Sequence, residues 1–519
     1  MKKLLCAVLA GLMLLSCSPA LPEPETETET ESVTEAVEET REPIPATVFT
    51  DADEAMRALL NAEDTELGKA FYTPESYEAF SAVKDEVTAA LEGETPLEEL
   101  GTLYDRLIAA KASLDYVRSN TARVYIISDK RIPREYIDCT VIVVPAADDE
   151  ENEPFRDECK IKVRGNSTAA GPKFPYNIKL SEKTELLGMD KGKKWALLAN
   201  LFDPSLIRNT LALGLATDMG IPYVSDFCHV EVFLNGANHG SYLLTESVGV
   251  GKTAVDIDIE NHDFLLELDR DRREDGVNYY KTRLGMRFAI EEPEEYSSDD
   301  KQCLKDMLNA AEEALLTHDM ETYRAYFDVE SFVNFYIHSE ITKNIDINDY
   351  STRYFIKNGV VTCGPVWDYD LSMGNVSDRK KEEKYALYGN RPGYGTESGD
   401  SAEGAWMTMG WIGEMLKDPA FRELAAERFR ELLPMFENLY EDNELGQNRI
   451  DALMERYGES FRRNYTASRW KDNRAYTDLS RQEPLGFELE VEWLRDWLKR
   501  RVANVTEIIE AGLATAEGE

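Results

Sequence analysis

The spacing of hydrophobic positions changes near residue 120 and divides the chain into a helical part and a mixed part. Between residues 51 and 116, apolar side chains recur at intervals of three and four residues, which is typical of amphipathic helices. Thr73-Pro74-Glu75 and Thr95-Pro96-Leu97-Glu98 each place a capping threonine before a proline, and this predicts two helix starts. The pattern predicts three helices in this region.

After Arg123, short apolar runs and alternating patterns predict strands. The runs are VYIISD (124–129), CTVIVVP (139–145) and FLLELD (264–269), and the alternating segments are 159–165 and 174–180. Asn-Gly pairs between apolar runs predict hairpins over 228–246 and 352–363. Asp203-Pro204 predicts the start of a helix that ends at Gly220, and the chain beyond about residue 300 is predicted to be mainly helical. These elements together predict an α+β fold.

The first residues predict an exported chain. Lys2 and Lys3 precede an apolar run, Leu4–Leu15, that is too short to span a bilayer stably. The run ends in Leu14-Leu15-Ser16-Cys17, which resembles a bacterial lipobox. We therefore expect residues 1–17 to form a lipoprotein signal peptide and Cys17 to carry the lipid. That lipid would anchor the protein to the extracytoplasmic face of the cell membrane, as a bacterial cell-surface lipoprotein. The alternatives are an ordinary cleavable signal or a chance cysteine.

Residues 18–48 form a Glu/Thr/Pro tract with almost no aliphatic bulk. Such a tract cannot bury enough apolar area to offset its ordering entropy, so it predicts a disordered acidic tether. The helical region that follows, 49–118, resembles the FIVAR-type three-helix modules of bacterial surface proteins, particularly in YTPESYEAF (72–80). This resemblance implies spacing or contact with sugars and the cell wall, and a plain helical stalk is the alternative.

Charge and cysteine content narrow the possible partners. The chain has 519 residues and a net charge of −41, which argues against nonspecific binding to nucleic acid. An acidic protein of this kind could still bind ATP through a local basic pocket or a divalent metal.

Removing Cys6 and lipidating Cys17 would leave five cysteines without a CxxC pair, so a zinc site or a disulfide framework is not expected. One disulfide is possible in an oxidising compartment, and its partners stay open.

The first segment with candidate chemistry is RGNST (164–168), between two predicted strands. The second strand carries Lys179, and a glycine-containing loop beside a strand with an inward lysine is a way to cover nucleotide phosphates. Further cations follow at Lys191, Lys193, Lys194 and Arg208. The candidate nucleotide-binding residues are Arg164, Asn166, Ser167, Lys179 and Lys194. A solvated lysine-rich surface is the alternative.

The second segment surrounds the hairpin at 352–363. Asp346 precedes this hairpin, and Asp368 and Asp370 follow it. Because paired strands lie about 5 Å apart, the hairpin should bring its two outer ends, and therefore the three carboxylates, together. Carboxylates packed so closely repel one another unless a cation compensates, and a divalent metal that holds ATP phosphates would do so. Surface carboxylates on loops are the alternative.

The two segments occur in a set that resembles the spore coat protein H (CotH) kinase family and covers roughly residues 122–512. The matching segments are IKVRGNST (161–168), PYNIKL (175–180), LLGMDKGKKWALLANLFDPSLIRN (186–209), MGIPY (219–223), VEVFLNG (230–236), GSYLLTE (240–246), FLLELD (264–269), EITKNID (340–346) and GPVWDYDLSMGN (364–375). We interpret residues 119–515 as one CotH kinase-like domain.

The resemblance implies an atypical, two-lobed, protein-kinase-like fold that uses ATP with Mg²⁺ or Mn²⁺. It implies that Asp346 is the catalytic-loop aspartate and that Asp368 and Asp370 bind metal, with Asp370 also catalytic. Arg164 and Lys179 would contact phosphate. The chain departs from the family pattern at Ala169, where an aromatic residue often stands, and at Ser351, where an asparagine is expected.

The segment 203–219 contains no glutamate to pair with Lys179, and Glu246 or Glu267 could substitute for it. The five histidines form no recognisable cluster, and we interpret them as structural.

Three functions follow from these patterns. The first is an extracytoplasmic, lipid-anchored kinase that transfers phosphate from ATP to Ser or Thr of an unknown surface or coat protein. The second is a non-catalytic surface or coat-assembly protein that retains the fold. The third is an enzyme that transfers another phosphate-containing group, such as a nucleotidyl moiety.

Overall fold

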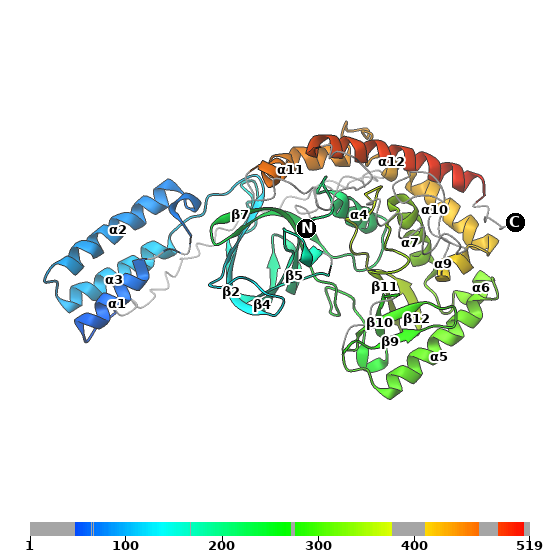
Figure 1. The fold of residues 1–519 in the computed structure, drawn as a ribbon, viewed down its shortest axis with the longest axis horizontal. Helices are drawn as coiled ribbons and strands as arrows, with labels where there is room; N and C mark the ends of the chain where they lie inside the picture. The colour runs from blue at the N-terminus through cyan, green and yellow to red at the C-terminus, as the bar shows by residue number, and fades with distance from the viewer. Residues whose placement is uncertain are drawn as a thin grey trace, which may run out of the picture. The chain divides into compact units, whose positions relative to one another are not determined.

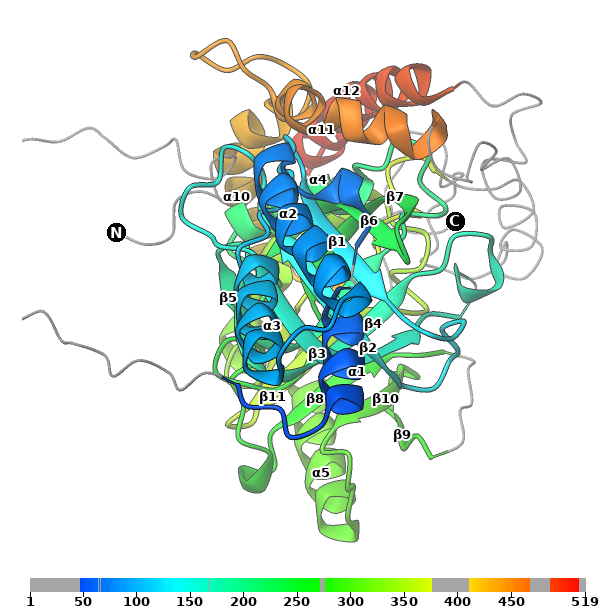
Figure 2. The same ribbon diagram turned by 90° about the vertical axis from the view of Figure 1, so that its left-hand side faces the viewer.

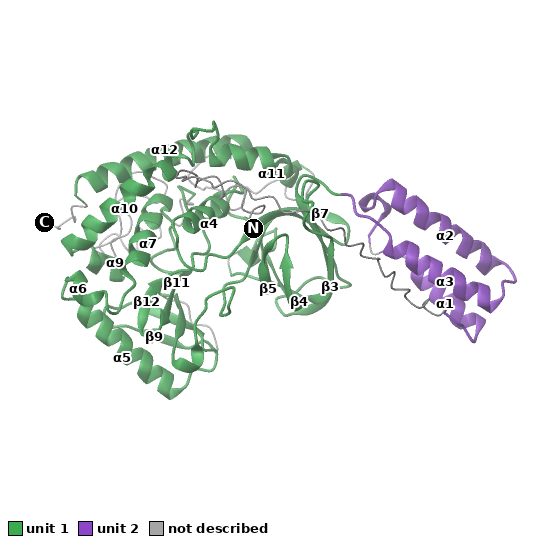
Figure 3. Ribbon diagram, turned by 180° about the vertical axis from the view of Figure 1, so that it is seen from behind, with its two compact units in different colours: residues 1–10, 118–519 green, residues 11–117 purple. Residues whose placement is uncertain are grey.

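The computed structural model describes residues 47–63, 65, 67–166, 168–270, 276–375, 410–466 and 486–512. The chain divides into two compact units, one of residues 11–117 and the other of residues 1–10 and 118–519 (Figure 3). The predicted signal peptide, Cys17, tether residues 18–46 and Ser167 lie outside the described residues. Within the described residues, the structure has no helix that is both long and apolar enough to cross a membrane.

The smaller unit contains three helices, α1 (Ala52–Glu63), α2 (Pro74–Glu92) and α3 (Leu97–Ala112). Their shared core includes Leu59, Phe80, Val87 and Leu107. Thr73 caps α2 as predicted, because its Oγ1 accepts a hydrogen bond from the Ser76 N–H (3.4 Å). The predicted cap of α3 is wrong. That helix begins after Pro96, and the Thr95 hydroxyl instead donates to the Ala90 carbonyl (2.8 Å).

The larger unit begins with a closed seven-stranded barrel in the order β1-β2-β3-β4-β5-β7-β6 (Figure 1). The strands are β1 (Ala122–Ile127), β2 (Ile137–Val144), β3 (Phe155–Val163), β4 (Tyr176–Leu186), β5 (Met189–Leu198), β6 (Phe227–Leu234) and β7 (Ala237–Glu246). Neighbouring strands are antiparallel except β1 and β6, whose parallel pairing closes the barrel. The sequence predicts most of these strands, but neither β5 nor the closure.

A second, five-stranded sheet follows in the order β12-β11-β8-β10-β9. Its strands are β8 (Phe264–Leu268), β9 (Tyr279–Lys281), β10 (Arg287–Glu292), β11 (Thr352–Lys357) and β12 (Val360–Cys363). Both predicted Asn-Gly hairpins are confirmed. Asn358 and Gly359 turn between β11 and β12 with φ of 53° and 80°, a backbone conformation that favours these two residue types.

Helices pack on both the barrel and the second sheet. They are α4 (Arg208–Asp218), α5 (Ser298–Leu315), α6 (Met320–Tyr323), α7 (Val329–Thr342), α9 (Gly410–Met415), α10 (Pro419–Glu437), α11 (Arg449–Thr466) and α12 (Phe487–Glu510). The elements in chain order also include the short helices η1 (Lys69–Phe71), η2 (Thr168–Ala170) and η3 (Ile259–Asn261). Helix α11 packs on β7, whereas α10 and α12 pack near α7 (Figure 1). Figure 2 shows α5 beside the second sheet from another side.

The predicted start of α4 at Asp203 is wrong, because this helix begins at Arg208. The Asp203 carboxylate instead accepts hydrogen bonds from the N–H groups of Ser205 and Arg208 and so orders the turn before the helix. The observed mixture of barrel, sheet and helices confirms the α+β class.

Candidate functional site

The hairpin β11–β12 brings the two segments at its outer ends together, as predicted. The Asn344 side chain joins them: its Oδ1 accepts from the Asp346 N–H (3.0 Å), and its Nδ2 donates to the Asp368 carbonyl (2.9 Å). Backbone hydrogen bonds from Ile345 to Leu371 (3.2 Å) and from Met373 to Thr342 (2.7 Å) continue the contact. Segments 342–346 and 368–373 therefore run side by side.

The side chains of the three predicted acids have different surroundings. Asp370 is buried, Asp346 is half-buried and Asp368 is exposed. Asp368 has φ of 69°, and its carboxylate accepts a long hydrogen bond from the Ser351 hydroxyl (3.4 Å). No group of three His, Cys, Asp or Glu side chains that could hold a metal ion occurs within the described residues. The predicted convergence of all three carboxylates is therefore not seen.

The backbone around Asp370 is fixed from several sides. The Asn375 amide donates to the carbonyls of Asp370 and Phe202, both at 2.6 Å. Gly374 has φ of 79°, and a Cβ at this position would lie only 2.4 Å from the Trp493 ring. The glycine that closes GPVWDYDLSMGN is thus required by both backbone conformation and close packing.

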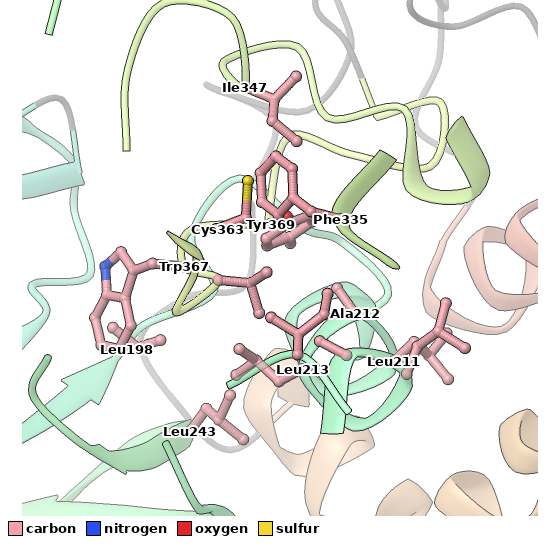
Figure 4. Packing of buried hydrophobic residues seen from close by; sticks show 14 of the residues in the cluster. Leu198, Leu211, Ala212, Leu213, Leu243, Phe335, Ile347, Cys363, Trp367 and Tyr369 are labelled. Carbon is pink, nitrogen blue, oxygen red and sulfur yellow. The ribbon is translucent and has the colours of Figure 1, made fainter. Parts of the chain in front are cut away.

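Arg164 of the RGNST loop lies beside the segment that carries Asp368 and Asp370. Its guanidinium is 5.2 Å from the centre of the Trp367 ring, a distance at which cation–π attraction operates. Burial lowers the pKa of Arg164, and the charge of Asp368 is the largest opposing influence, with Glu267 and Asp370 adding to it. Trp367 and Leu198 at the end of β5 belong to the same buried hydrophobic cluster (Figure 4).

Arg353 on β11 is a site residue that sequence reasoning missed. It is buried, lies 5.9 Å from the Trp367 ring centre, and forms ion pairs with Glu291 (3.0 Å) and Glu267 (3.5 Å). Burial opposes the charge of Arg353, but these two glutamates outweigh burial and raise its pKa. The two arginines around Trp367 thus face four carboxylates, from Glu267, Glu291, Asp368 and Asp370.

Two buried polar atoms in this region lack a hydrogen-bond partner among the described residues. They are Nη1 of Arg353 and Nη2 of Arg208. Arg208 is fully buried at the start of α4, where its Nε donates to the Ser372 carbonyl (3.1 Å) and its Nη1 pairs with Asp203 (2.5 Å). Buried donors left unpaired are costly, so anionic ligand oxygens or water would suit both sites.

The predicted lysines lie away from the acids. Lys179 and Lys194 face each other across β4 and β5, and both are exposed on the outer face of the barrel. The prediction of an inward lysine is wrong, because Tyr176, Ile178 and Leu180 occupy the buried face of β4. Asn166 is also exposed.

Strand register gives the separation of Lys179 from Arg164. Lys179 lies opposite Lys160 on β3, and Arg164 is four residues further along the chain. At about 3.3 Å per residue, the two backbone positions are roughly 13 Å apart along the strands.

The two glutamates proposed as partners of Lys179 have other neighbours. Glu267 pairs with Arg353. Glu246 is half-buried near Lys183, Asp190 and Asp226. Neither glutamate is shown to pair with Lys179.

The donor set around Trp367 suits a hard divalent cation. Mg²⁺ is commonly held by one or two carboxylates together with phosphate oxygens and water, and Asp368 and Asp370 can provide the carboxylates. A nucleotide phosphate would in turn suit the guanidinium groups of Arg164 and Arg353.

The fold and the site define an α+β protein in which the RGNST loop of the barrel lies beside the segment that follows the β11–β12 hairpin and carries Asp368 and Asp370. Residues 161–505 match the family model described as CotH kinase protein, and the chain therefore belongs to the CotH kinase protein family. The matched range contains RGNST and GPVWDYDLSMGN. No curated protein matches the chain.

Proposed function

We propose that this protein is an atypical kinase that transfers the terminal phosphate of ATP to a Ser or Thr hydroxyl of a surface or coat protein. The observation that carries the proposal is the meeting of Arg164 with Asp368 and Asp370 around Trp367. Family membership supports the same reaction class. A two-lobed arrangement, with the barrel and the second sheet on opposite sides of the nucleotide, belongs to this proposal.

In this proposal, each residue acts through its charge and position. Asp368 and Asp370 hold Mg²⁺ or Mn²⁺, which when bound would neutralise charge on the phosphates. Arg164 contacts phosphate oxygens, and Asp346 accepts or orients the acceptor hydroxyl proton. Asn344 keeps Asp346 beside the metal-binding segment through its two hydrogen bonds.

Lys179 and Lys194 have a secondary role in the proposal. They share the outer barrel face, and their distance from the acids suits the far end of a triphosphate better than the transferred phosphate. Asn166 and Ser167 would contribute from the RGNST loop.

We further propose that the protein acts outside the cytoplasm and is held to the membrane by lipid on Cys17. The support is the order of basic residues, apolar run and lipobox-like cysteine at the N-terminus. An acidic tether and the helical unit would then space the kinase domain from the membrane. Replacing Cys17 with alanine should release the protein from the membrane fraction, and an unchanged distribution would argue against the anchor.

Transfer of phosphate tests the central proposal. The full chain should be incubated with Mg²⁺ or Mn²⁺, a mixture of candidate proteins, and ATP carrying the label in its terminal phosphate. Mass spectrometry of the product should show a phosphoryl group on Ser or Thr, and Asp346→Asn should lose this modification. A nucleotidyl adduct would instead support the other transfer reaction. Lack of modification together with no nucleotide-dependent rise in melting temperature would favour a non-catalytic surface protein.

A further inference from the structure

The sequence does not decide which of five cysteines could form a disulfide. Two of them lie directly opposite each other in the barrel. Cys139 on β2 and Cys159 on β3 are cross-strand partners, and their Sγ atoms are 3.6 Å apart. Cys303 lies on α5 and Cys363 on β12, both outside the barrel. Backbone pairing, rather than a surface contact, therefore brings the first two thiols together.

Both thiols belong to the barrel interior. Cys139 and Cys159 are 6% and 5% exposed and pack within the main hydrophobic core. The residues that precede Cys139 and follow Cys159, Asp138 and Lys160, are exposed and form an ion pair (3.7 Å). Because side chains alternate across a strand, this outward pair places the two cysteines on the inward face.

The geometry points to a disulfide between Cys139 and Cys159, formed when the chain folds in an oxidising environment. Directly opposed residues in antiparallel strands have Cα atoms about 4.5–5.5 Å apart, within the range that a disulfide spans. The two sulfurs would have to approach by about 1.5 Å to reach the bond length of ~2.05 Å. Rotation of the two side chains, with a small movement of the strands, can provide this.

The bond requires an external oxidant, for which a soluble or protein disulfide suffices. The thiolate of one cysteine attacks a sulfur of the oxidant and releases one thiolate, and the second cysteine then displaces the other half from the mixed disulfide. The cysteine pair loses two electrons and two protons, and the oxidant is reduced to two thiols. The hydrogen bond between the two thiols and burial both raise the pKa of Cys159 in the folded chain, which favours reaction before the barrel closes.

This inference goes beyond the proposed function and does not depend on catalysis. Export, as proposed above, would supply the oxidising compartment in which such bonds persist. The bond would close a short loop across β2 and β3 and restrict the unfolded chain, so it should stabilise the barrel. Phosphate transfer is measured in a separate experiment. If the protein transfers no phosphate, the disulfide inference is unaffected.

Refolding tests the bond directly. The reduced, unfolded full chain should be refolded with oxidised and reduced glutathione, alkylated and digested, and its peptides analysed by mass spectrometry. We expect a Cys139–Cys159 cross-linked peptide that disappears after reduction. Recovery of both residues as alkylated thiols, or linked to other cysteines, would overturn the inference, and this measurement needs no variant to fold.

Matched variants test the consequence for stability. Reduction should lower the melting temperature of the oxidised wild type by about 5 °C. The control Cys228→Ala/Cys303→Ala, which removes a half-buried thiol on β6 and another on α5 but keeps the pair, should show the same decrease. Cys139→Ala/Cys159→Ala should melt at one temperature with or without reductant. An equal response of that double variant to reductant would contradict the assignment.

Discussion

Around the β11–β12 hairpin, charged and amide side chains are buried and hydrogen-bonded, whereas on the barrel face Lys179 and Lys194 extend into solvent. Both regions were expected to contribute to one nucleotide site. Under the proposed function, the difference predicts different roles. The hairpin region is preorganised, so substitutions there should change both stability and phosphate transfer, whereas substitutions of the barrel lysines should change phosphate transfer with little effect on stability.

The largest effect is expected at Asp370. Asp370→Asn removes a carboxylate charge from the proposed metal site, so phosphate transfer should fall by about 10³-fold. Steady-state kinetics with saturating metal would measure the loss.

Asp349→Asn is the control for this change. Asp349 is buried and accepts a hydrogen bond from Arg270 (2.9 Å), close to the site but paired within the fold. It should lose thermal stability and retain most transfer activity. Equal loss of transfer in both variants would mean that Asp370 acts only through general structure.

The next largest effect is expected at Arg353. Arg353→Met would leave Glu267 and Glu291 without their shared cation, and breaking a largely buried ion pair costs about 3 kcal/mol of unfolding free energy. Denaturant unfolding would measure this cost. The triple variant that also carries Glu267→Gln and Glu291→Gln should recover part of the stability, and failure to recover it would indicate that packing on Trp367 dominates.

Lys179 gives the sharpest comparison between the regions. Lys179→Met should lower transfer by about 10-fold through a weaker interaction with nucleotide phosphate, with an increase in KM for ATP. Stability should change by less than about 0.5 kcal/mol, because the side chain is exposed.

Lys160→Met is the matched control for Lys179→Met. Lys160 is the cross-strand neighbour of Lys179, is also exposed on β3 and forms an ion pair with Asp138. Loss of transfer only in the Lys179 variant would assign a role to that position. Unchanged kinetics in both variants would remove the barrel lysines from the site.

The smallest effect is expected at Glu246. Burial raises its pKa from 4.5 to about 7, with Lys183 opposing the shift and Asp190 and Asp226 adding to it. Between pH 4.5 and 7 the unfolded chain therefore loses a proton that the folded chain retains, so stability contributed by this group falls as pH rises.

Glu246→Gln should consequently stabilise the protein at pH 8, by about 1 kcal/mol after allowance for solvent screening, and have no effect near pH 4. Melting curves across this range would measure the difference. A stabilisation that does not vary with pH would show that the carboxyl does not titrate in this way.

Local signals in the sequence predicted much of the fold. The Asn-Gly turns at 235–236 and 358–359 and the Thr73 cap depend on residues next to one another in the chain, and the structure has each of them. The hairpin prediction also brought segments 342–346 and 368–373 side by side, because the two ends of a hairpin are adjacent, although the three carboxylates do not converge.

Other features depend on which distant strands pair, and residue patterns do not encode this directly. The barrel encloses Tyr176, Ile178 and Leu180 and leaves Lys179 outside, and pairing of β8 with β10 and β11 brought Glu267 and Glu291 to Arg353. The register of β2 and β3 selected Cys139 and Cys159 from five cysteines. The sequence by itself thus determined the local turns, the β11–β12 hairpin and the family resemblance. Only the tertiary structure decided which buried charges and thiols meet, because these contacts join residues far apart in the chain.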